Sequence, residues 1–445
     1  MPDRRNDKMK LGAFFHPTGN HIAAWLHSGS QIDAGTNFEH YAALAQTAEA
    51  AKFDLMFLAD AVATRNGRLN ALKRWPQYMA YFDPMVLLSG IAARTSRLGL
   101  VATAATSYNE PYHVARRYAS LDHLSHGRAG WNAVTSSNHS ESRNFGREEH
   151  LSHREKYERA LEFLEVVKGL WDSWEDDAFR RDRTTAEYFD PAKLHPLNHK
   201  GAHFSVAGPL NVARPPQGHP IIAQAGGSDD FIDMAGRHAD LIFTAQFDLE
   251  SAQALYGKLA AAVKKHGRPA GSLKVMPGLN AIVGRTEKEA QEKHEHLSSL
   301  IHPDVGREVL SNDLGNVDLS GVPLDAPIPE EIVEEQLRFW LRFMKEATGK
   351  ENPTLRETYR HYGSARGQRP LVGTASQIAD EMERWFQGRG ADGFLIHPAT
   401  LPDGLEDICG LLIPELQNRG LFRTEYEGET LRENLGLPRP KNRYA

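Results

Sequence analysis

A histidine and a tyrosine, His153 and Tyr157, stand four residues apart, shortly after a stretch rich in hydroxyl and amide side chains. Ser152 with Glu155 three residues later is typical of a capping box, which marks a helix start. Residues four apart lie on one side of a helix, so both rings would project from its first turns. Free N–H groups and the positive end of the helix dipole attract anions there. The pattern predicts a phosphate site, although an ordinary helix surface beside a loop fits the same residues.

A second candidate anion site follows an apolar run later in the chain. Gly226 and Gly227 leave backbone N–H groups accessible, and Ser228 can cap the helix predicted to follow. A plain strand-to-helix turn explains these residues equally well. If an anion binds here, the carboxylates of Asp229 and Asp230 must point away from it.

The elements that would position these residues alternate between short apolar runs and longer amphipathic stretches. Runs of strand type cover residues 11–15, 53–60, 97–106, 129–134, 219–226, 239–245, 273–284 and 391–398. Helical patterns lie between or after them, at 38–52, 84–94, 111–124, 152–171, 229–238, 249–266, 374–387 and 405–418, with a further start at Thr286 and Glu289. Eight strands alternating with helices predict an α/β fold, a (β/α)₈ TIM barrel with insertions, in one domain over residues 1–445.

Two segments interrupt this repeat, and a polar tail follows it. Residues 175–217 are polar and Pro-rich, and residues 301–372 contain a helical pattern of Ile332, Leu337, Trp340, Leu341 and Met344. Insertions of this size usually cover the active-site face of a barrel or pack at an interface, so the longer one is the candidate lid. The tail, residues 422–445, is expected to lie over the surface or over a partner subunit.

Working residues of a barrel lie where its strands end, at the C-terminal face. This rule selects polar residues that follow the apolar runs: His16, Asp60, Thr103, Thr106, Asn132, Ser136, Gly226, Gly227, Ser228 and Gln246. A histidine of the first loop could act as a base or a hydrogen-bond donor. Any one of the 21 histidines is more often structural, so the catalytic residue stays unknown.

Composition narrows the partners and the compartment. The net charge is −6 with both signs interspersed, which argues against nucleic acid, and no basic run is present to dock on a membrane surface. No apolar run is long enough to span a membrane. A single cysteine, Cys409, excludes an internal disulfide, so we expect a cytoplasmic protein.

The sequence lacks the motifs of several other classes of enzyme and binding site. The chain has no CxxC pair and no HExxH helix, so no metal site is expected. It has no GxSxG elbow of a serine hydrolase and no GxGxxG turn of a dinucleotide-binding fold.

The stretch from Gly127 to Leu164, GRAGWNAVTSSNHSESRNFG followed by the predicted helix, resembles the signature of the luciferase-like flavin monooxygenases. Within them it is most similar to the branch of the nitrilotriacetate and dibenzothiophene sulfone monooxygenases. The resemblance extends from about Leu11 to about Leu421. It implies a two-component monooxygenase that takes reduced FMN from a separate NAD(P)H-dependent flavin reductase, with O₂ as co-substrate, and oxygenates a small organic substrate.

The resemblance also implies where FMN binds. His153, Tyr157 and Ser228 would lie near its phosphate, and Asp60 and Thr106 near its ring and ribityl chain. To these we add two cofactor-binding candidates from the residues themselves: Gly227, for its accessible backbone, and Asn132, whose amide could face the flavin edge. A buried Asn132 bonded to a neighbouring strand is an equally good interpretation.

Two alternatives remain open from sequence. A deazaflavin-dependent oxidoreductase of the same superfamily would transfer hydride without oxygen, and a non-catalytic flavin-binding protein would share only the fold. Helix faces on the outside of the barrel suggest a homodimer or homotetramer. The identity of the substrate is not readable from the sequence.

Overall fold

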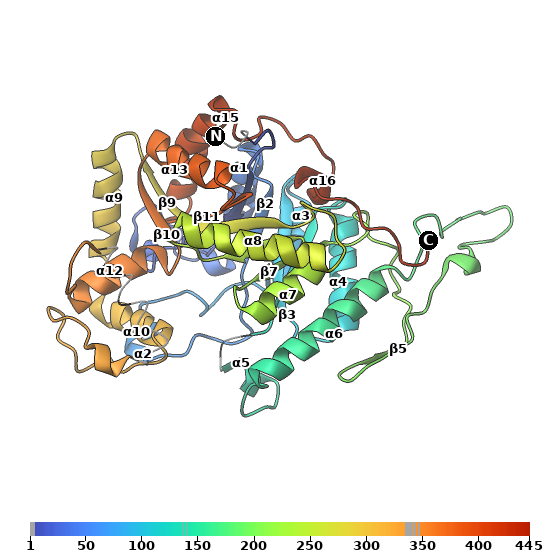
Figure 1. The fold of residues 1–445 in the computed structure, drawn as a ribbon, viewed down its shortest axis with the longest axis horizontal. Coiled ribbons are helices and arrows are strands. Elements are labelled where there is room, and N and C mark those ends of the chain that lie inside the picture. Colours follow the sequence, from blue (N-terminus) through green and yellow to red (C-terminus); the bar gives the residue numbers. More distant parts are fainter. Residues whose placement is uncertain (1–4, 137, 139, 334–340, 342–343, 346–347) are drawn as a thin grey trace.

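The structure is a computed structural model, and it describes residues 5–136, 138, 140–333, 341, 344–345 and 348–445. Within these residues eight parallel strands close into a barrel, because the last strand pairs with the first. The strands are, in order around the barrel, β1 (Lys10–Phe14), β2 (Leu55–Leu58), β3 (Gly99–Ala105), β4 (Ala129–Val134), β7 (Ile221–Ala225), β8 (Leu241–Thr244), β9 (Lys274–Gly284) and β11 (Gly393–Pro398). The predicted (β/α)₈ barrel is confirmed (Figure 1).

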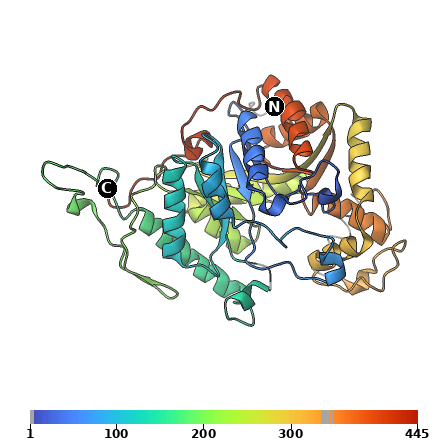
Figure 2. The ribbon, with the colours of Figure 1, turned by 180° about the vertical axis from the view of Figure 1, so that it is seen from behind.

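Helices surround this barrel at the predicted places (Figures 1 and 2). They are α1 (Phe38–Ala50), α3 (Pro84–Ala92), α4 (Pro111–Leu124), α6 (His153–Trp171), α7 (Asp229–His238), α8 (Leu249–Lys265), α9 (Glu287–Ser299), α13 (Ala375–Gln387), and the run α14 (Asp403–Asp407), Ile408–Leu412 and α15 (Ile413–Asn418). Their inner faces pack on the outward side chains of the strands and form the main core. Among the described residues, no helix has the length and apolarity needed to cross a membrane.

The predicted helix starts have the expected hydrogen bonds. Ser152 and Glu155 form a reciprocal capping box at α6, and Thr374 and Gln377 form one at α13. Thr286 caps α9, but the carboxylate of Glu289 accepts from the N–H of Arg285, so that box is only half formed.

One strand of the main sheet was not predicted. β10 (Arg369–Thr374) pairs with residues 279–284 of β9, whereas β8 pairs with residues 274–277 on the same strand. β10 therefore continues the barrel wall past the end of β8. Its sequence, RPLVGT, is short and contains Pro and Gly at the end of the longer insertion, so it carries no clear strand pattern.

The longer insertion packs over the first two strand-to-helix loops. It contains α10 (Pro303–Asp313) and α12 (Leu355–Ala365), and α10 contacts the short α2 (Leu69–Leu72). Its apolar residues, among them Val305 and Tyr359, form a second core with Ile22 and Trp75 from those loops. Leu337 and Trp340 of the predicted helical pattern lie outside the described residues. The shorter insertion carries the hairpin of β5 (His199–Lys200) and β6 (Ser205–Val206), which extends away from the barrel (Figure 1).

The first part of the C-terminal tail lies under the barrel. The short helix α16 (Leu431–Asn434) and Leu435 contribute buried leucines to the inner barrel core. The N–H of Leu431 donates to the carbonyl of Gly127, just before β4, and Arg432 forms a buried ion pair of 2.8 Å with Asp240, just before β8. This part of the tail closes the N-terminal end of the barrel, which was not expected. Residues 439–444 run over the surface as expected, where Arg439 pairs with Asp176 and Tyr444 stacks on His195 of the shorter insertion.

Candidate active site

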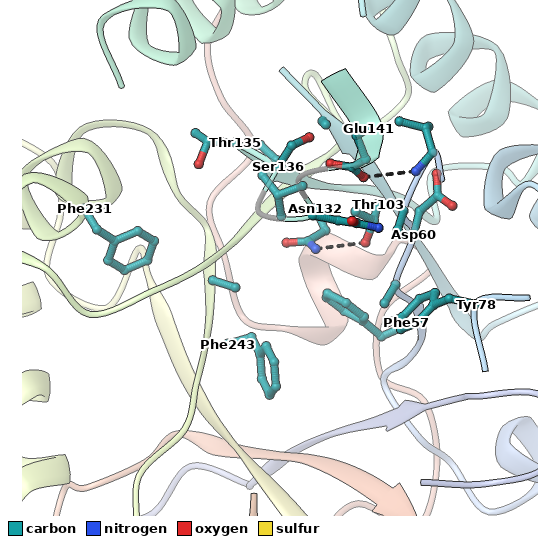
Figure 3. A pocket seen from close by; sticks show the side chains of 18 of the residues that line it. Phe57, Asp60, Tyr78, Thr103, Asn132, Thr135, Ser136, Glu141, Phe231 and Phe243 are labelled. Carbon is teal, nitrogen blue, oxygen red and sulfur yellow. Dashed lines mark hydrogen bonds between the residues drawn. The ribbon is translucent and has the colours of Figure 1, made fainter. Parts of the chain in front are cut away.

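A cavity of about 410 Å³ opens at the C-terminal ends of β1, β2, β3, β4, β7 and β8 (Figure 3). One part of its wall is apolar and includes Phe14, Phe57, Phe231, Met234 and Phe243. The polar part includes Asp60, Thr103, Asn132, Ser136 and Glu141. An apolar enclosure with a few polar groups is typical of a small-molecule site.

Asn132 lies at the centre of the polar wall. Its Nδ2 donates to Thr103 Oγ1 at 2.9 Å (Figure 3). The Thr103 hydroxyl in turn donates to the carbonyl of Leu58 at 2.8 Å. The amide is bonded to the neighbouring strand, as one of the two interpretations of Asn132 expects. Its buried Oδ1 has no partner among the described residues, so the other interpretation, a contact with the flavin edge, stays a prediction. That oxygen can accept a hydrogen bond from a ligand.

Asp60 follows β2 and has an unusual acidity. Burial and the nearby carboxylates of Asp83 and Glu141 raise its pKa to about 6, against the opposing hydrogen bond from Tyr81. The Tyr81 hydroxyl lies 3.2 Å from Asp60 Oδ1. A carboxyl group with such a pKa can hold or release a proton near neutral pH.

The loop after β4 brings two further polar atoms to the cavity. Glu141, in the short helix α5 (Ser140–Asn144), accepts from the N–H of Val62 at 3.0 Å through Oε1, while Oε2 has no partner in the described part of the chain. The same holds for Ser136 Oγ, and the Ser136 backbone has φ +54°. Lys156 of α6 fixes this loop by donating to the Ser136 carbonyl at 3.0 Å.

Sequence reasoning did not select Glu141 or Tyr78 as candidate site residues. Tyr78 lines the cavity and has φ +60°, which is unusual for a bulky residue and marks a position held by its surroundings. Glu141 belongs to the motif that carries the family resemblance, so its position in that motif was an available signal. Tyr78 carried no comparable signal, because it lies in a long loop.

The predicted phosphate residues lie at two neighbouring helix starts. His153 and Tyr157 project together from α6, with ring centroids 4.7 Å apart; Tyr157 lines the cavity and His153 is exposed. Ser228 caps α7 through a hydrogen bond from the Phe231 N–H, and the space beside Gly227 is open. The side chain of Asp229 is 91% exposed and pairs with Lys258, as a nearby anion would require.

Thr106 lies elsewhere. It is buried, its hydroxyl donates to the carbonyl of Val134 at 3.2 Å, and it is not among the residues that line the cavity. The structure therefore brings Asp60, Asn132 and Tyr157 to one cavity, places His153, Gly227 and Ser228 at helix starts, and leaves Thr106 behind the wall.

The cavity fits the flavin that the sequence resemblance implies. Three buried oxygens without partners among the described residues, on Asn132, Ser136 and Glu141, face a space with aromatic walls. A flat ring system with a polar edge would satisfy such atoms while its faces contact apolar side chains. In the described residues, no group of three or more His, Cys, Asp or Glu side chains is placed to hold a metal ion.

Comparison with known proteins gives full-length matches. A family model described as luciferase-like monooxygenase matches residues 13–393. The chain is 48% identical to N-acetyl-S-(2-succino)cysteine monooxygenase of Bacillus subtilis (strain 168) and 44% identical to nitrilotriacetate monooxygenase component A of Aminobacter aminovorans, with 99% of each chain covered in both cases. Among solved structures, EDTA monooxygenase from Chelativorans sp. BNC1 has a TM-score of 0.83 at 34% identity, over 97% of this chain and 99% of that one.

Proposed function

This chain belongs to the luciferase-like monooxygenase family, and we propose that it oxygenates a small organic substrate with reduced FMN and O₂. The enzyme class follows from relatives named as monooxygenases that match over their full lengths. The observation that supports the cofactor assignment is the cavity. Oxygens on Asn132, Ser136 and Glu141 that have no partner among the described residues would be satisfied by a polar ligand edge between aromatic walls.

The proposed binding mode places the FMN phosphate at the starts of α6 and α7. His153, Tyr157 and Ser228 would hold it with the backbone of Gly227, since both helix N-termini present N–H groups. Asp60, Thr106 and Asn132 would lie on the side of the ring and ribityl chain. Thr106 would act there through the strand end that it supports, because its hydroxyl bonds the carbonyl of Val134.

Reduced FMN, when bound, supplies the electrons that activate O₂. The chain's own residues would orient it and exclude water: Phe57, Phe231 and Phe243 form apolar walls, and Asn132 Oδ1 would accept a hydrogen bond from its edge. Asp60 can hold or give up a proton at its carboxyl group, because its pKa is about 6.

The partners follow from the same proposal. A relative is named component A, and we infer that a separate NAD(P)H-dependent flavin reductase supplies reduced FMN to this chain as well. The longer insertion packs on the loops at the C-terminal face, which supports its role as a cover over the cavity. We propose a homodimer or homotetramer in the cytoplasm.

Anaerobic titration of the purified chain with reduced FMN, followed by ¹⁸O₂ and a substrate, tests the reaction. We expect saturable binding of reduced FMN and one ¹⁸O atom in the product. N-acetyl-S-(2-succino)cysteine and nitrilotriacetate are the first substrates to try, since relatives are named for them. Product without ¹⁸O, formed with a reduced deazaflavin, would instead support hydride transfer. Tight flavin binding without any turnover would support a binding protein.

A further inference from the structure

A second group of polar side chains surrounds the rim where β1, β9 and β11 end, and the proposed flavin site does not use it. Arg366, in the turn between α12 and β10, has its Nη1 3.2 Å from Nε2 of His16, just after β1. His397 on β11 and Asn280 on β9 are partners in the strand register. They are 2% and 1% exposed.

These side chains lack partners. Within the described residues, both ring nitrogens of His397 and the Nδ2 of Asn280 lack a hydrogen-bond partner. No carboxylate of the described residues forms an ion pair with Arg366. Its guanidinium contacts the ring of His16. Arg366 is half-buried, whereas the donors of His397 and Asn280 are buried, and burying a donor without a partner costs free energy that a bound anion would offset.

The positive charge of Arg366 lowers the pKa of both His16 and His397. Burial, together with Arg366, holds the pKa of His397 at about 3 and that of His16 well below its ordinary value of 6.5. Both rings are therefore neutral at physiological pH, and each carries one N–H donor. The cluster combines the Arg366 cation with neutral donors, and Arg65 lies near enough to lower the pKa of His16 as well, so the local charge is positive and suits an oxyanion.

The backbone at Arg366 gives independent support. Arg366 ends α12 in the left-handed conformation with φ +52°, at a position where glycine is preferred. The residue that follows is a glycine, so an arginine at this point is a poor choice for the turn itself. A side-chain function explains why the less suitable residue stands there.

The cluster borders the cavity. His397 stacks on Phe14 with ring centroids 4.3 Å apart, and Phe14 lines the cavity. Gln368 lies over Gly278: a Cβ there would sit 2.0 Å from Gln368 Oε1 and 2.8 Å from Phe243, another lining residue. Only a glycine at position 278 leaves room for this arrangement.

The cluster lies across the barrel from the proposed phosphate site. In the closed order of eight strands, β11 and β1 stand opposite β4 and β7, whose following helices begin at His153 and Asp229. One flavin phosphate cannot occupy both rims, so an anion at Arg366 belongs to a different molecule or group.

We propose that Arg366, with Asn280 and His397, binds a carboxylate of the organic substrate, so that the enzyme acts on organic acids. The guanidinium fork matches the two oxygens of a carboxylate, and the Asn280 amide and the His397 N–H supply further donors. This inference rests on the proposed function, because it assigns a substrate group to a cluster that adjoins Phe14 and Phe243 of the proposed flavin cavity.

Isothermal titration calorimetry with succinate tests the carboxylate site, and the uncharged succinamide serves as the matched ligand. We expect the full-length chain to bind succinate and not succinamide. Arg366→Met should weaken succinate binding by about tenfold or more, as expected for a lost charge-assisted pair. Arg366→Lys should bind with intermediate affinity, because a lysine keeps the charge and loses the fork.

Arg356→Met is the control, since Arg356 lies near the start of α12, at the other end from Arg366, and pairs at the surface with Asp325. It should bind succinate like the unmodified chain. Asn280→Ala tests the same site through a neutral group, and several-fold weaker binding is expected even if Arg366→Met fails to fold. Three results would overturn the proposal. The Arg366 and Asn280 variants could bind succinate as tightly as the unmodified chain does, the unmodified chain could bind succinamide as tightly as succinate, or it could fail to bind succinate.

Titration with reduced FMN separates this inference from the proposed function. Reduced FMN should bind the Arg366→Met variant as it binds the unmodified chain. If that variant loses FMN affinity instead, Arg366 belongs to the flavin site and the substrate assignment is wrong. If reduced FMN fails to bind any form of the chain, the proposed function fails, whatever the succinate result.

Discussion

Asp60 is the residue whose protonation is most affected by its place in the fold. Its pKa of about 6 lies above the ordinary 3.8, because burial and neighbouring carboxylates disfavour the charged form. The folded state thus binds this proton more tightly than the unfolded chain does. The stability gained from that proton is fully present below pH 3.8 and is lost as the pH rises through about 6.

Asp60→Asn tests this linkage, because an amide stays neutral at every pH. We expect the thermal midpoint of the variant to rise relative to the unmodified chain at about pH 7.5, and this advantage to shrink at about pH 5. Asp325→Asn, an exposed control with a side chain 80% accessible, should show no such pH dependence. A difference between the Asp60 variant and the unmodified chain that is the same at both pH values would show that the carboxyl keeps its ordinary acidity.

Single residues also show how far sequence reasoning reaches. The rule of strand ends found Asp60, Thr103 and Asn132, which line the cavity. The same rule selected Thr106, although side chains alternate along a strand and Thr103 and Ala105 already occupy the inward positions. Tyr78 could not be found in this way, because its place depends on a long loop folding back over the barrel.

At the scale of elements, the start of α6 carries the phosphate proposal. Tyr157→Phe removes one hydroxyl and leaves the ring contact with His153 possible. If that hydroxyl holds phosphate, reduced FMN should bind about three- to tenfold more weakly, while reduced riboflavin, which lacks the phosphate, should bind as before. An equal loss for both ligands would place Tyr157 at the ring instead. Tyr188→Phe, on an exposed side chain of the shorter insertion, is the control.

The elements themselves were largely predictable. All eight barrel strands and the helices between them follow from apolar periodicity and capping residues, and α7 has the predicted bounds, Asp229–His238. β10 was missed because its pairing is set by the length of β9, which extends past the end of β8 and exposes an edge that only a non-local segment can fill. Local patterns carry no such information.

At the scale of the whole molecule, residues 422–437 of the tail close the N-terminal end of the barrel, and we call them the plug. Leu431 is fully buried in the inner barrel core, so Leu431→Ala should lower the free energy of unfolding by about 2–5 kcal/mol, measured by urea denaturation. Leu124→Ala is the matched control, because Leu124 is 62% exposed, and its effect should stay within about 0.5 kcal/mol. A small effect of Leu431→Ala would mean that the barrel closes without its tail.

Charged pairs attach this plug and the N-terminal segment to the strand starts. Arg432 pairs with Asp240, Arg423 with Asp54, and Arg5 with Asp392. Each of these aspartates also accepts from the N–H of a neighbouring strand, that is from Ile222, Leu11 and Val275 respectively. The sequence shows the aspartate before each strand, but the distant arginine is set only by the closed topology.

The position of the plug along the chain bears on synthesis. During translation, Leu431 leaves the ribosome only after every strand of the barrel has emerged. The edge of β1 stays unpaired until β11, its neighbour in the closed barrel, has been made. A nascent chain of this protein therefore holds an open sheet with two free edges and an unsealed apolar interior for most of its translation. We expect its yield in cells to depend on chaperones that shield such edges until the last segment arrives.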